Sequence, residues 1–164
     1  EVLFDILALL KEEGLKFTLF STIEVKDWPE VVRPYEERVK ELNLCGNVFF
    51  MGRVPPSQMG ALYKACDLMV YPSLCESFGF SRIEAMGYGL PIVAAATAVN
   101  REICGDGAIY YGPLDAEDGA KAILSALDPG GSAKLKEEGR KRVDSFDWGW
   151  ARYAKEFVSM IGAV

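Results

Sequence analysis

Two glutamates separated by seven residues, Glu76 and Glu84, are the side chains of this sequence best placed for binding chemistry. They are the first and last residues of the segment ESFGFSRIE. This segment lies between an apolar run that ends at Tyr71-Pro72 and a predicted helix of small residues. A strand, a loop and a helix N-terminus in this order form anion and nucleotide sites in open α/β sheets. We expect the first carboxylate to face a sugar-like polyol from the loop. The second is expected to reach in from the first turns of the helix.

A simpler interpretation is that both glutamates are solvated charges, since the chain carries 24 acidic residues. The surroundings of Glu84 argue against it, because Ile83, Ala85 and Met86 predict a closely packed stretch of helix. A carboxylate held in such a stretch needs a hydrogen-bonding partner. These surroundings weaken the case for a surface role, and they do so for Glu84 in particular.

Composition limits the class of protein. With 164 residues, of which 50% are hydrophobic, the chain is large enough for one domain with a sizeable core, residues 1–164. The net charge of −6 argues against a nucleic-acid partner, which needs a basic face, although a local basic cluster could still bind one diphosphate. No apolar stretch approaches the ~20 residues of a membrane span.

The residue types that are absent narrow the chemistry further. The chain has no histidine, which excludes Ser-His-Asp and Cys-His catalysis and histidine metal sites. Its four cysteines are scattered without a C-x-x-C pair, which predicts free thiols and a cytoplasmic location. Acid–base chemistry must come from carboxylates, tyrosine or lysine, or from residues outside this chain.

Helical and strand patterns alternate along the chain. Strands are predicted over residues 17–21, 48–51, 68–71, 91–95 and 108–110, and helices over 2–13, 31–42, 57–65, 81–88, 100–103, 115–127, 133–145 and 147–160. Ser57 or the residue before it, Asp115 and Asp147 are the expected helix caps, and the segment 129–132 is expected to break the helix before it. The alternation predicts a parallel sheet covered on both faces.

The segment YPSLCESFGFSRIEAMGYGLPIVAA resembles the donor-binding segment of the C-terminal domain of retaining GT-B glycosyltransferases. It is most similar to the group that includes sucrose-phosphate synthases, phosphatidylinositol mannosyltransferases and many bacterial cell-surface sugar transferases. Their signature is a glutamate, seven residues and a second glutamate, followed by Gly-x-Pro-[IV]-[IV]-[AG]. The stretches NVFFMGRV, MGALYKACD, GDGAIYYGPLDAEDGAKAI and FDW also match, so the resemblance covers nearly the whole chain. It implies a Rossmann-like, doubly wound parallel sheet.

The resemblance assigns roles to the loop and to the start of the helix. Glu76 would hydrogen-bond hydroxyls of the transferred sugar, and it is the residue of this chain expected to take part in catalysis. Phe78, Gly79, Phe80 and Ser81 would offer backbone N–H groups to the sugar and the diphosphate. Gly79 permits close approach, and the helix dipole near Ser81 favours the diphosphate.

The nucleoside would be bound by a second group of residues. By the same resemblance, Glu84 would bind the ribose hydroxyls bidentately, and Val54 with Arg53 and Met59 would line the nucleobase pocket. No Asp-x-Asp motif is present, so neither a catalytic metal nor another cofactor is expected beyond the nucleotide sugar itself. Arg82 could reach a phosphate, but a surface or salt-bridge role is favoured for it.

Two parts of the family's enzymes have no counterpart here. The facing N-terminal Rossmann-like domain, with the acceptor site and a histidine, is expected outside this chain, and any peripheral membrane contact only through that domain. Family members also open the present domain with a strand, which is central in the order 3-2-1-4-5-6. We therefore expect a fragment of a longer protein, or a swapped or substituted strand. An ordinary central strand within residues 1–20 would contradict this.

The predicted function is that of a retaining glycosyltransferase in carbohydrate biosynthesis, of the hexosyltransferase type. It would transfer a sugar from a UDP-, GDP- or ADP-sugar to an acceptor that the sequence does not identify, and the isolated fragment is expected to be inactive. Two alternatives remain. One is a noncatalytic nucleotide-sugar-binding module, and the other a GT-B-fold epimerase or phosphorylase relative, whose histidine or lysine-bound cofactor the sequence does not signal.

Overall fold

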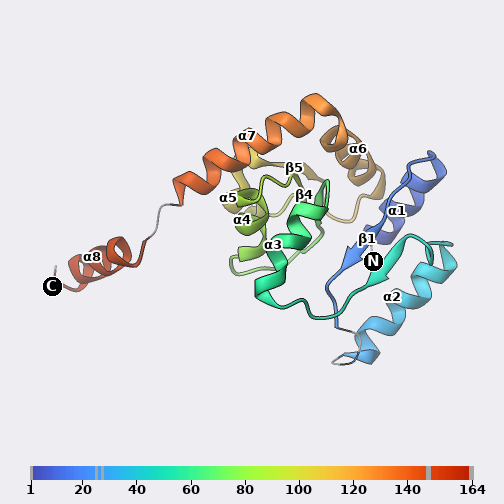
Figure 1. Cartoon of the computed structure of the whole chain (residues 1–164), viewed down its shortest axis with the longest axis horizontal. Coiled ribbons are helices and arrows are strands. Elements are labelled where there is room, and N and C mark those ends of the chain that lie inside the picture. Colours follow the sequence, from blue (N-terminus) through green and yellow to red (C-terminus); the bar gives the residue numbers. More distant parts are fainter. Residues whose placement is uncertain (1, 25, 27, 147–148, 163–164) are drawn as a thin grey trace.

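Short parallel strands form two separate sheets in the computed structural model, which describes residues 2–24, 26, 28–146 and 149–162. Strands β1 and β2 pair with each other, and the second sheet has the order β3-β4-β5. Figure 1 labels β4 and β5 among the helices at the centre of the molecule and β1 to one side of them. The strands are β1 (Leu19–Ser21), β2 (Val48–Phe50), β3 (Met69–Tyr71), β4 (Ile92–Ala95) and β5 (Ala108–Tyr111). The helices are α1 (Val2–Glu12), α2 (Pro29–Glu41), α3 (Pro56–Ala65), α4 (Phe80–Gly87), α5 (Ala98–Cys104), the 3-10 helix η1 (Gly105–Gly107), α6 (Ala116–Leu127), α7 (Pro129–Ser145) and α8 (Trp150–Ile161).

Strand β4 carries apolar side chains to both faces of its sheet, and each face has its own core. Val93 and Ala95 belong to one core, whereas Ile92 and Ala94 belong to the other. All four are buried. Successive side chains of a strand point to opposite faces, so a strand that is apolar throughout must be covered twice. This arrangement confirms the predicted α/β fold.

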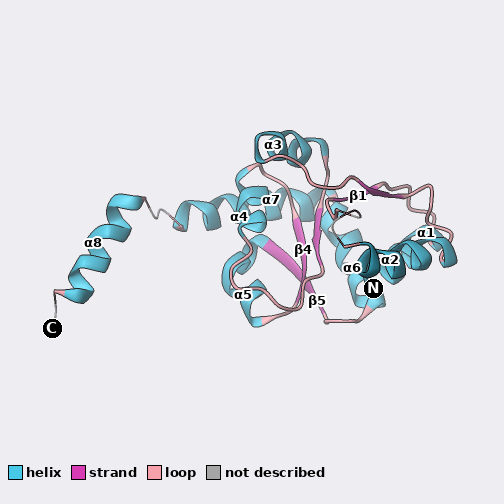
Figure 2. Ribbon diagram, turned by 90° about the horizontal axis from the view of Figure 1, so that it is seen from below, coloured by secondary structure: helices cyan, strands magenta, loops and turns pink. Residues whose placement is uncertain are grey.

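Helices supply the cover on both faces. Helices α1 and α6 contact each other over the first core, and α4 packs on the second. Helix α7 reaches both, because Leu135 joins the first core and Val143 the second. Figure 2 shows β4 and β5 between α4 and α5 on one side and α6 on the other, with α8 apart from them. Among the residues described, no helix is both long and apolar enough to cross a membrane.

A break in strand pairing separates β1 from β3. In the described part of the chain β1 pairs with β2 alone, and residues 2–12 form a helix rather than a strand. Met69 donates its backbone N–H to the carbonyl oxygen of Pro91 at 2.9 Å, so the backbone groups of the next residue, Val70, point away from β4. Strand β3 is half-buried throughout, whereas β4 is buried. The predicted central strand thus has no counterpart among the described residues, and its origin in a longer protein stays a prediction.

The predicted helix caps have different outcomes. Asp115 caps α6 as predicted, since its carboxylate accepts from the backbone N–H three residues on, at 2.9 Å. Ser57 does not cap α3, which begins at Pro56 without a side-chain cap. A proline there fixes φ for the first helical turn and has no N–H to satisfy. Asp147 lies outside the described residues, and Gly149 takes the position before α8.

The segment 129–132 forms the first turn of α7 and is not the loop that we predicted. Asp128 accepts from the backbone N–H groups of Gly130 at 3.0 Å and Gly131 at 3.3 Å. Pro129 takes the first helical position, where a backbone N–H has no helical partner. A Cβ at Gly131 would overlap the carbonyl oxygen of Ser125 in α6. The glycine therefore permits the tight turn from α6 into α7.

Replacing Gly131 with Ala should lower the free energy of unfolding by about 1–3 kcal/mol, because the added methyl group meets a backbone oxygen that cannot move away. Urea unfolding followed by circular dichroism measures the change. Gly130→Ala is the matched control, since its Cβ would meet only the tip of the Asp128 side chain at 3.2 Å. It should change stability by less than about 0.5 kcal/mol. Equal effects of the two substitutions would contradict this explanation.

Candidate functional site

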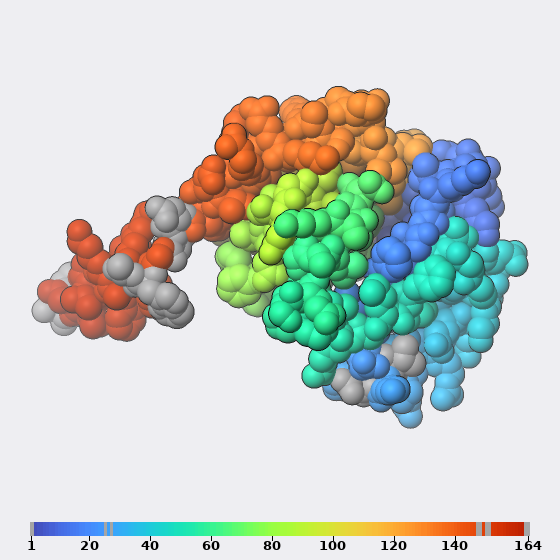
Figure 3. Space-filling model, in the orientation of Figure 1, coloured from blue at the N-terminus to red at the C-terminus, as the bar shows by residue number. Residues whose placement is uncertain are grey.

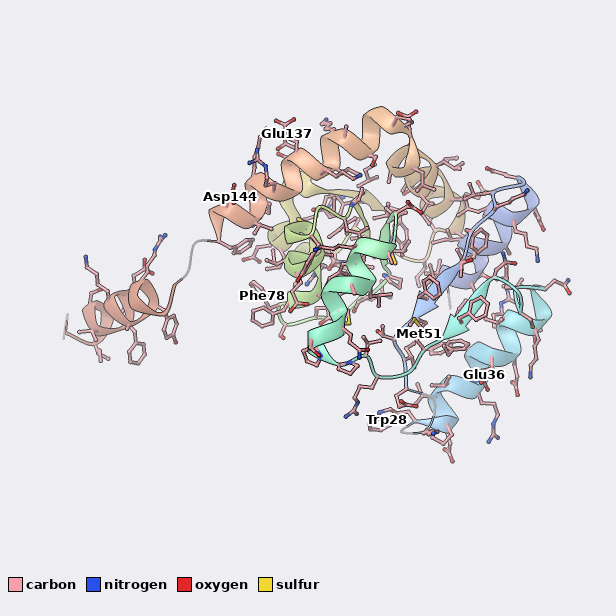
Figure 4. All side chains as sticks on the ribbon, in the orientation of Figure 1. Trp28, Glu36, Met51, Phe78, Glu137 and Asp144 are labelled. Carbon is pink, nitrogen blue, oxygen red and sulfur yellow. The ribbon has the colours of Figure 1, made fainter. Side chains whose placement is uncertain are left out.

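The loop from β3 to α4 lies at the carboxyl end of its strand and depends on one glycine. Gly79 adopts φ +73°, in the left-handed region that disfavours other residues. A Cβ at this position would meet the hydroxyl oxygen of Tyr71 at 2.8 Å and would overlap the guanidinium of Arg82. Glycine is therefore required here by both conformation and space. Phe78, labelled in Figure 4, comes just before it on the same loop.

Hydroxyl groups hold the carboxylate of Glu76 on this loop. Ser73 Oγ donates to Glu76 Oε1 at 2.9 Å. The hydrogen bonds from Tyr71, which has the larger effect, and from Ser73 hold the pKa of Glu76 below its ordinary value. Burial raises the pKa of Tyr71 to about 12, so its hydroxyl stays protonated and can donate. Glu76 is therefore an ionised, oriented acceptor near neutral pH.

The first turn of α4, which begins four residues after Glu76, presents backbone N–H groups without a side-chain cap. The cap residue is Gly79, so no cap side chain satisfies these groups. The first N–H groups of a helix lack intrahelical partners and attract anions. The side chain of Phe80, at the first helical position, is 70% exposed. Phe78, Gly79 and Ser81 are half-buried, so the predicted residues 78–81 form a partly accessible turn whose first helical N–H groups suit a phosphate or sugar oxygen.

Glu84 lies on the same helix and faces α3. Its Oε2 accepts from the Tyr63 hydroxyl at 3.0 Å, and burial followed by this hydrogen bond raises the pKa of Tyr63 above its ordinary value. Glu84 is exposed, while the following Ala85 and Met86 are buried. The carboxylate thus has a protein partner for one oxygen and remains open to a ligand.

A pocket of about 300 Å³ lies between α3 and α4 beside this carboxylate. Figure 3 shows the two helices next to each other on the front face of the molecule. The pocket brings two predicted site residues together, and its lining is Pro56, Met59, Gly60, Tyr63, Glu84 and Tyr88. Two of these lining residues are in close contact, because a Cβ at Gly60 would overlap the hydroxyl of Tyr88.

Two other predicted residues lie at the carboxyl end of β2, outside the lining of this pocket. The backbone N–H of Arg53 donates to Glu24 Oε2 at 3.3 Å, and that of Lys26 to Glu24 Oε1 at 3.2 Å. The bonds from Lys26 and then Arg53 lower the pKa of Glu24. Val54 follows, half-buried, on the way to α3. Arg53 and Val54 thus lie on the segment between β2 and α3, and the lining of the pocket does not include them.

A larger pocket, of about 540 Å³, lies on the other side of the Tyr63–Tyr88 pair. Cys66 and Asp67 precede β3, and Pro91 precedes β4, so this pocket is at the amino ends of the strands. Open α/β sheets bind ligands at the carboxyl ends of their strands. The smaller pocket and the loop 73–79 are therefore the candidate site.

Sequence reasoning missed several residues that shape the site. Four of them hydrogen-bond to predicted site residues: Tyr63 to Glu84, Tyr71 and Ser73 to Glu76, and Glu24 to the backbone of Arg53. Arg82 was expected at the surface or on a phosphate, but it is fully buried. Its position three and four residues before the buried Ala85 and Met86 is the signal that places it on the inner face of α4. Among the described residues no group of three or more Cys, Asp or Glu side chains is placed to hold a metal ion.

A doubly covered parallel sheet with a glycine-cornered loop before a helix N-terminus is an arrangement typical of nucleotide-binding α/β domains. The family model for glycosyl transferases group 1 matches residues 25–142, so the chain belongs to this family. D-inositol 3-phosphate glycosyltransferase of Rhodococcus jostii is 31% identical over 118 residues, covering 68% of this chain and 25% of that protein. O-antigen chain mannosyltransferase RfbU of Salmonella typhimurium is 33% identical over 119 residues, covering 73% and 34%.

Solved structures agree on the fold. Sucrose-phosphate synthase from Thermosynechococcus elongatus superposes with a TM-score of 0.79 at 27% identity, over 98% of this chain and 43% of that one. Anabaena HepE, solved in complex with UDP and glucose, superposes with a TM-score of 0.79 at 20% identity, over 99% and 44%. These findings confirm the resemblance to the C-terminal domain of GT-B glycosyltransferases. The chain spans a quarter to a third of these curated relatives and less than half of these solved chains.

Replacing Tyr71 with Phe should raise the pKa of Glu76 toward its ordinary value near 4.5, because the most important hydrogen bond to its carboxylate is lost. A pKa lowered by folding contributes stability that is present above the ordinary pKa and is lost as pH falls through the folded-state value. The variant should therefore be less stable at about pH 7, and the difference should shrink below about pH 4. Carbon-13 NMR titration and urea unfolding measure the two effects.

Tyr111→Phe is the control for this substitution. Its hydroxyl is buried and has no hydrogen-bond partner among the described residues, so removing it should leave the Glu76 titration unchanged. An unchanged pKa in Tyr71→Phe, or the same shift in both variants, would contradict the assigned contact.

Proposed function

We propose that this chain is the donor-binding domain of a retaining, metal-independent glycosyltransferase that uses a nucleotide-diphosphate sugar. The observation that carries the proposal is one helix, α4, with an ionised glutamate held before its open N-terminus and a second glutamate facing a pocket. The structure of Anabaena HepE, which has a similar fold, is a complex with UDP and glucose, and this supports the same ligand class.

Glu84 binds the ribose in this proposal. Each carboxylate oxygen can accept two hydrogen bonds, so the bond from Tyr63 to Oε2 orients the group and leaves acceptor positions for two hydroxyls. Met59 lines the pocket next to it and would contact the nucleobase. Arg53 and Val54, at the end of β2, would close the base site from the other side. Glu24 would hold that loop through the backbone of Arg53.

Glu76 and the turn after it bind the rest of the donor. The carboxylate accepts from hydroxyls of the transferred sugar, since Tyr71 and Ser73 hold it ionised and oriented. The backbone N–H groups of Phe80 and Ser81 receive the diphosphate, whose charge the helix dipole favours. Gly79 allows the ligand to approach the backbone closely.

Catalysis follows from positioning and charge. Holding the donor in one geometry and stabilising the departing diphosphate lower the barrier without a covalent intermediate on this chain. Glu76 contributes by fixing the sugar ring. The acceptor and the facing domain would come from residues outside these 164, and so would the basic groups that complete neutralisation of the diphosphate.

Alanine at Glu84 should weaken binding of the bare nucleotide and of the nucleotide sugar alike, by about tenfold, because charged hydrogen bonds to the ribose are lost. Alanine at Glu76 should leave bare-nucleotide binding unchanged and reduce the preference for one sugar over another. Calorimetric titration of UDP-, GDP- and ADP-sugars and their nucleotides into the full-length protein measures both. Glu117→Ala, at an exposed position in the first turn of α6, is the control. Equal loss of bare nucleotide in both site variants would contradict this division of roles.

The isolated 164-residue chain should bind the donor weakly and transfer no sugar, because the acceptor site and the diphosphate's basic partners are proposed to lie outside it. The rate of sugar transfer is measured as the release of nucleotide from a mixture of radiolabelled donors. It is compared between this chain and the full-length protein. Sugar transfer by the isolated chain would refute the proposed division between domains. A full-length protein that binds the donor and transfers nothing to water or to any acceptor would favour a noncatalytic binding module.

A further inference from the structure

Arg82 carries a buried charge that the site described above does not use. Its side chain is completely buried, and the described residues place no carboxylate in ion-pair contact with it. Burying a charge without compensation is costly, so such a group persists only where other polar atoms receive it. The atoms that receive this guanidinium therefore indicate what it does.

Three oxygens and an aromatic ring surround the guanidinium. Nη1 donates to Asn100 Oδ1, and Nη2 donates to the carbonyl oxygen of Phe78. Nε donates to the carbonyl oxygen of Gly79 at 3.3 Å. The guanidinium carbon lies 4.5 Å from the ring centroid of Tyr71, within cation–π range. Arginine's planar fork of donors suits this set, whereas a lysine ammonium could not span it.

Asn100 extends the same network to the other end of the loop. This side chain is also fully buried. Its Nδ2 donates to the carbonyl oxygen of Ala95, at the end of β4, at 2.7 Å and to that of Ser73 at 3.3 Å. Its own backbone N–H is held by Thr97 Oγ1 at 3.1 Å. Asn100 thus ties the beginning of the loop to β4 while its oxygen accepts from Arg82.

The loop that carries Glu76 is therefore held at both ends by two buried side chains. Asn100 holds Ser73, and Arg82 holds Phe78 and Gly79. Ser73 and Tyr71, both in contact with this network, are the residues that hydrogen-bond the Glu76 carboxylate. Displacing either end of the loop would move these hydroxyls relative to the carboxylate.

We propose that Arg82 and Asn100 are positioning residues that fix the loop from Ser73 to Gly79 and thereby aim Glu76 at the sugar of the donor. The proposal rests on the function proposed above for Glu76. In this proposal the two side chains touch no ligand. They affect the gain in affinity that the sugar adds, and they do not affect the affinity for the bare nucleotide.

Arg142 provides a matched control for the chemistry. Its Nε donates to the carbonyl oxygen of Ile103 at 3.0 Å, and its Nη2 to that of Glu102. Its guanidinium carbon lies 4.5 Å from the ring centroid of Phe146. Arg142 therefore binds two carbonyls and a ring as Arg82 does, but it joins α7 to α5. Among the described residues its hydrogen bonds do not reach the loop 73–79, and it approaches this loop only through the Phe146 ring, which packs on Phe78.

The test uses Arg82→Lys and Asn100→Asp in the full-length protein. The first keeps the charge and loses the fork, and the second keeps the acceptor for Arg82 and loses the donors to Ala95 and Ser73. UDP, GDP and ADP, and UDP-glucose, GDP-mannose and ADP-glucose, are titrated calorimetrically. The gain in affinity from the sugar should fall about tenfold in both variants, with bare-nucleotide affinity within about twofold. Arg142→Lys should lower thermal stability and leave the gain from the sugar unchanged.

A second measurement needs no ligand. Amide hydrogen exchange of residues 74–79 should accelerate at least about tenfold in Arg82→Lys and Asn100→Asp relative to Arg142→Lys, because the loop loses an anchor. The pKa of Glu76 should rise in the same two variants and not in Arg142→Lys. Unchanged exchange and an unchanged gain from the sugar would overturn the positioning role. If no nucleotide binds even the original protein, the proposed function fails, and loop exchange with the Glu76 titration still decides whether the pair positions this carboxylate.

Discussion

The burial of the Arg82 guanidinium, with no carboxylate in ion-pair contact among the described residues, is the constraint on which the candidate site depends. Arg82 is stable in the interior only because the carbonyl oxygens of Phe78 and Gly79, the amide oxygen of Asn100 and the ring of Tyr71 receive its charge. Those carbonyls belong to the loop that carries Glu76. The energetic need of one buried cation therefore fixes the shape of a loop that would otherwise be free at the edge of the sheet.

The two glutamates use this rigidity in different ways. Glu76 sits on the restrained loop and is held by hydroxyl groups, whereas Glu84 is exposed on the helix and is held by Tyr63 from α3. Helix α4 is common to both, since its first turn follows the loop and its later residues face the pocket. A single helix thus sets the distance between the part of the site suited to a sugar and the part suited to a nucleoside. Its inner residues, Ala85 and Met86, anchor that helix in the core.

The fold around the site was largely predictable, and the misses have physical reasons. Apolar runs and helical periodicity located the strands and most helices, because burial imposes those periods on any covered sheet. The helix start at Pro129 was missed because two glycines resemble a break, and only the nearby carbonyl of Ser125 shows why glycine is needed. The break in pairing between β1 and β3 lies where the family resemblance predicts a central strand, and no strand of the described residues fills that position. Only the pairing of the strands, and not the sequence pattern, shows where in the sheet this position lies.

The sequence by itself determined the family, the α/β class and the pair of glutamates with its glycine turn, since these are local patterns of residue type and spacing. Tertiary structure decided which groups surround them. It brought Tyr63 to Glu84 across 21 residues and Asn100 to Arg82 across 18, and it placed Arg82 inside the domain and not on a phosphate. Hydrogen bonds between distant segments depend on how helices pack on the sheet. No spacing along the chain encodes that packing directly, so the partners of a buried charge become visible only in the folded molecule.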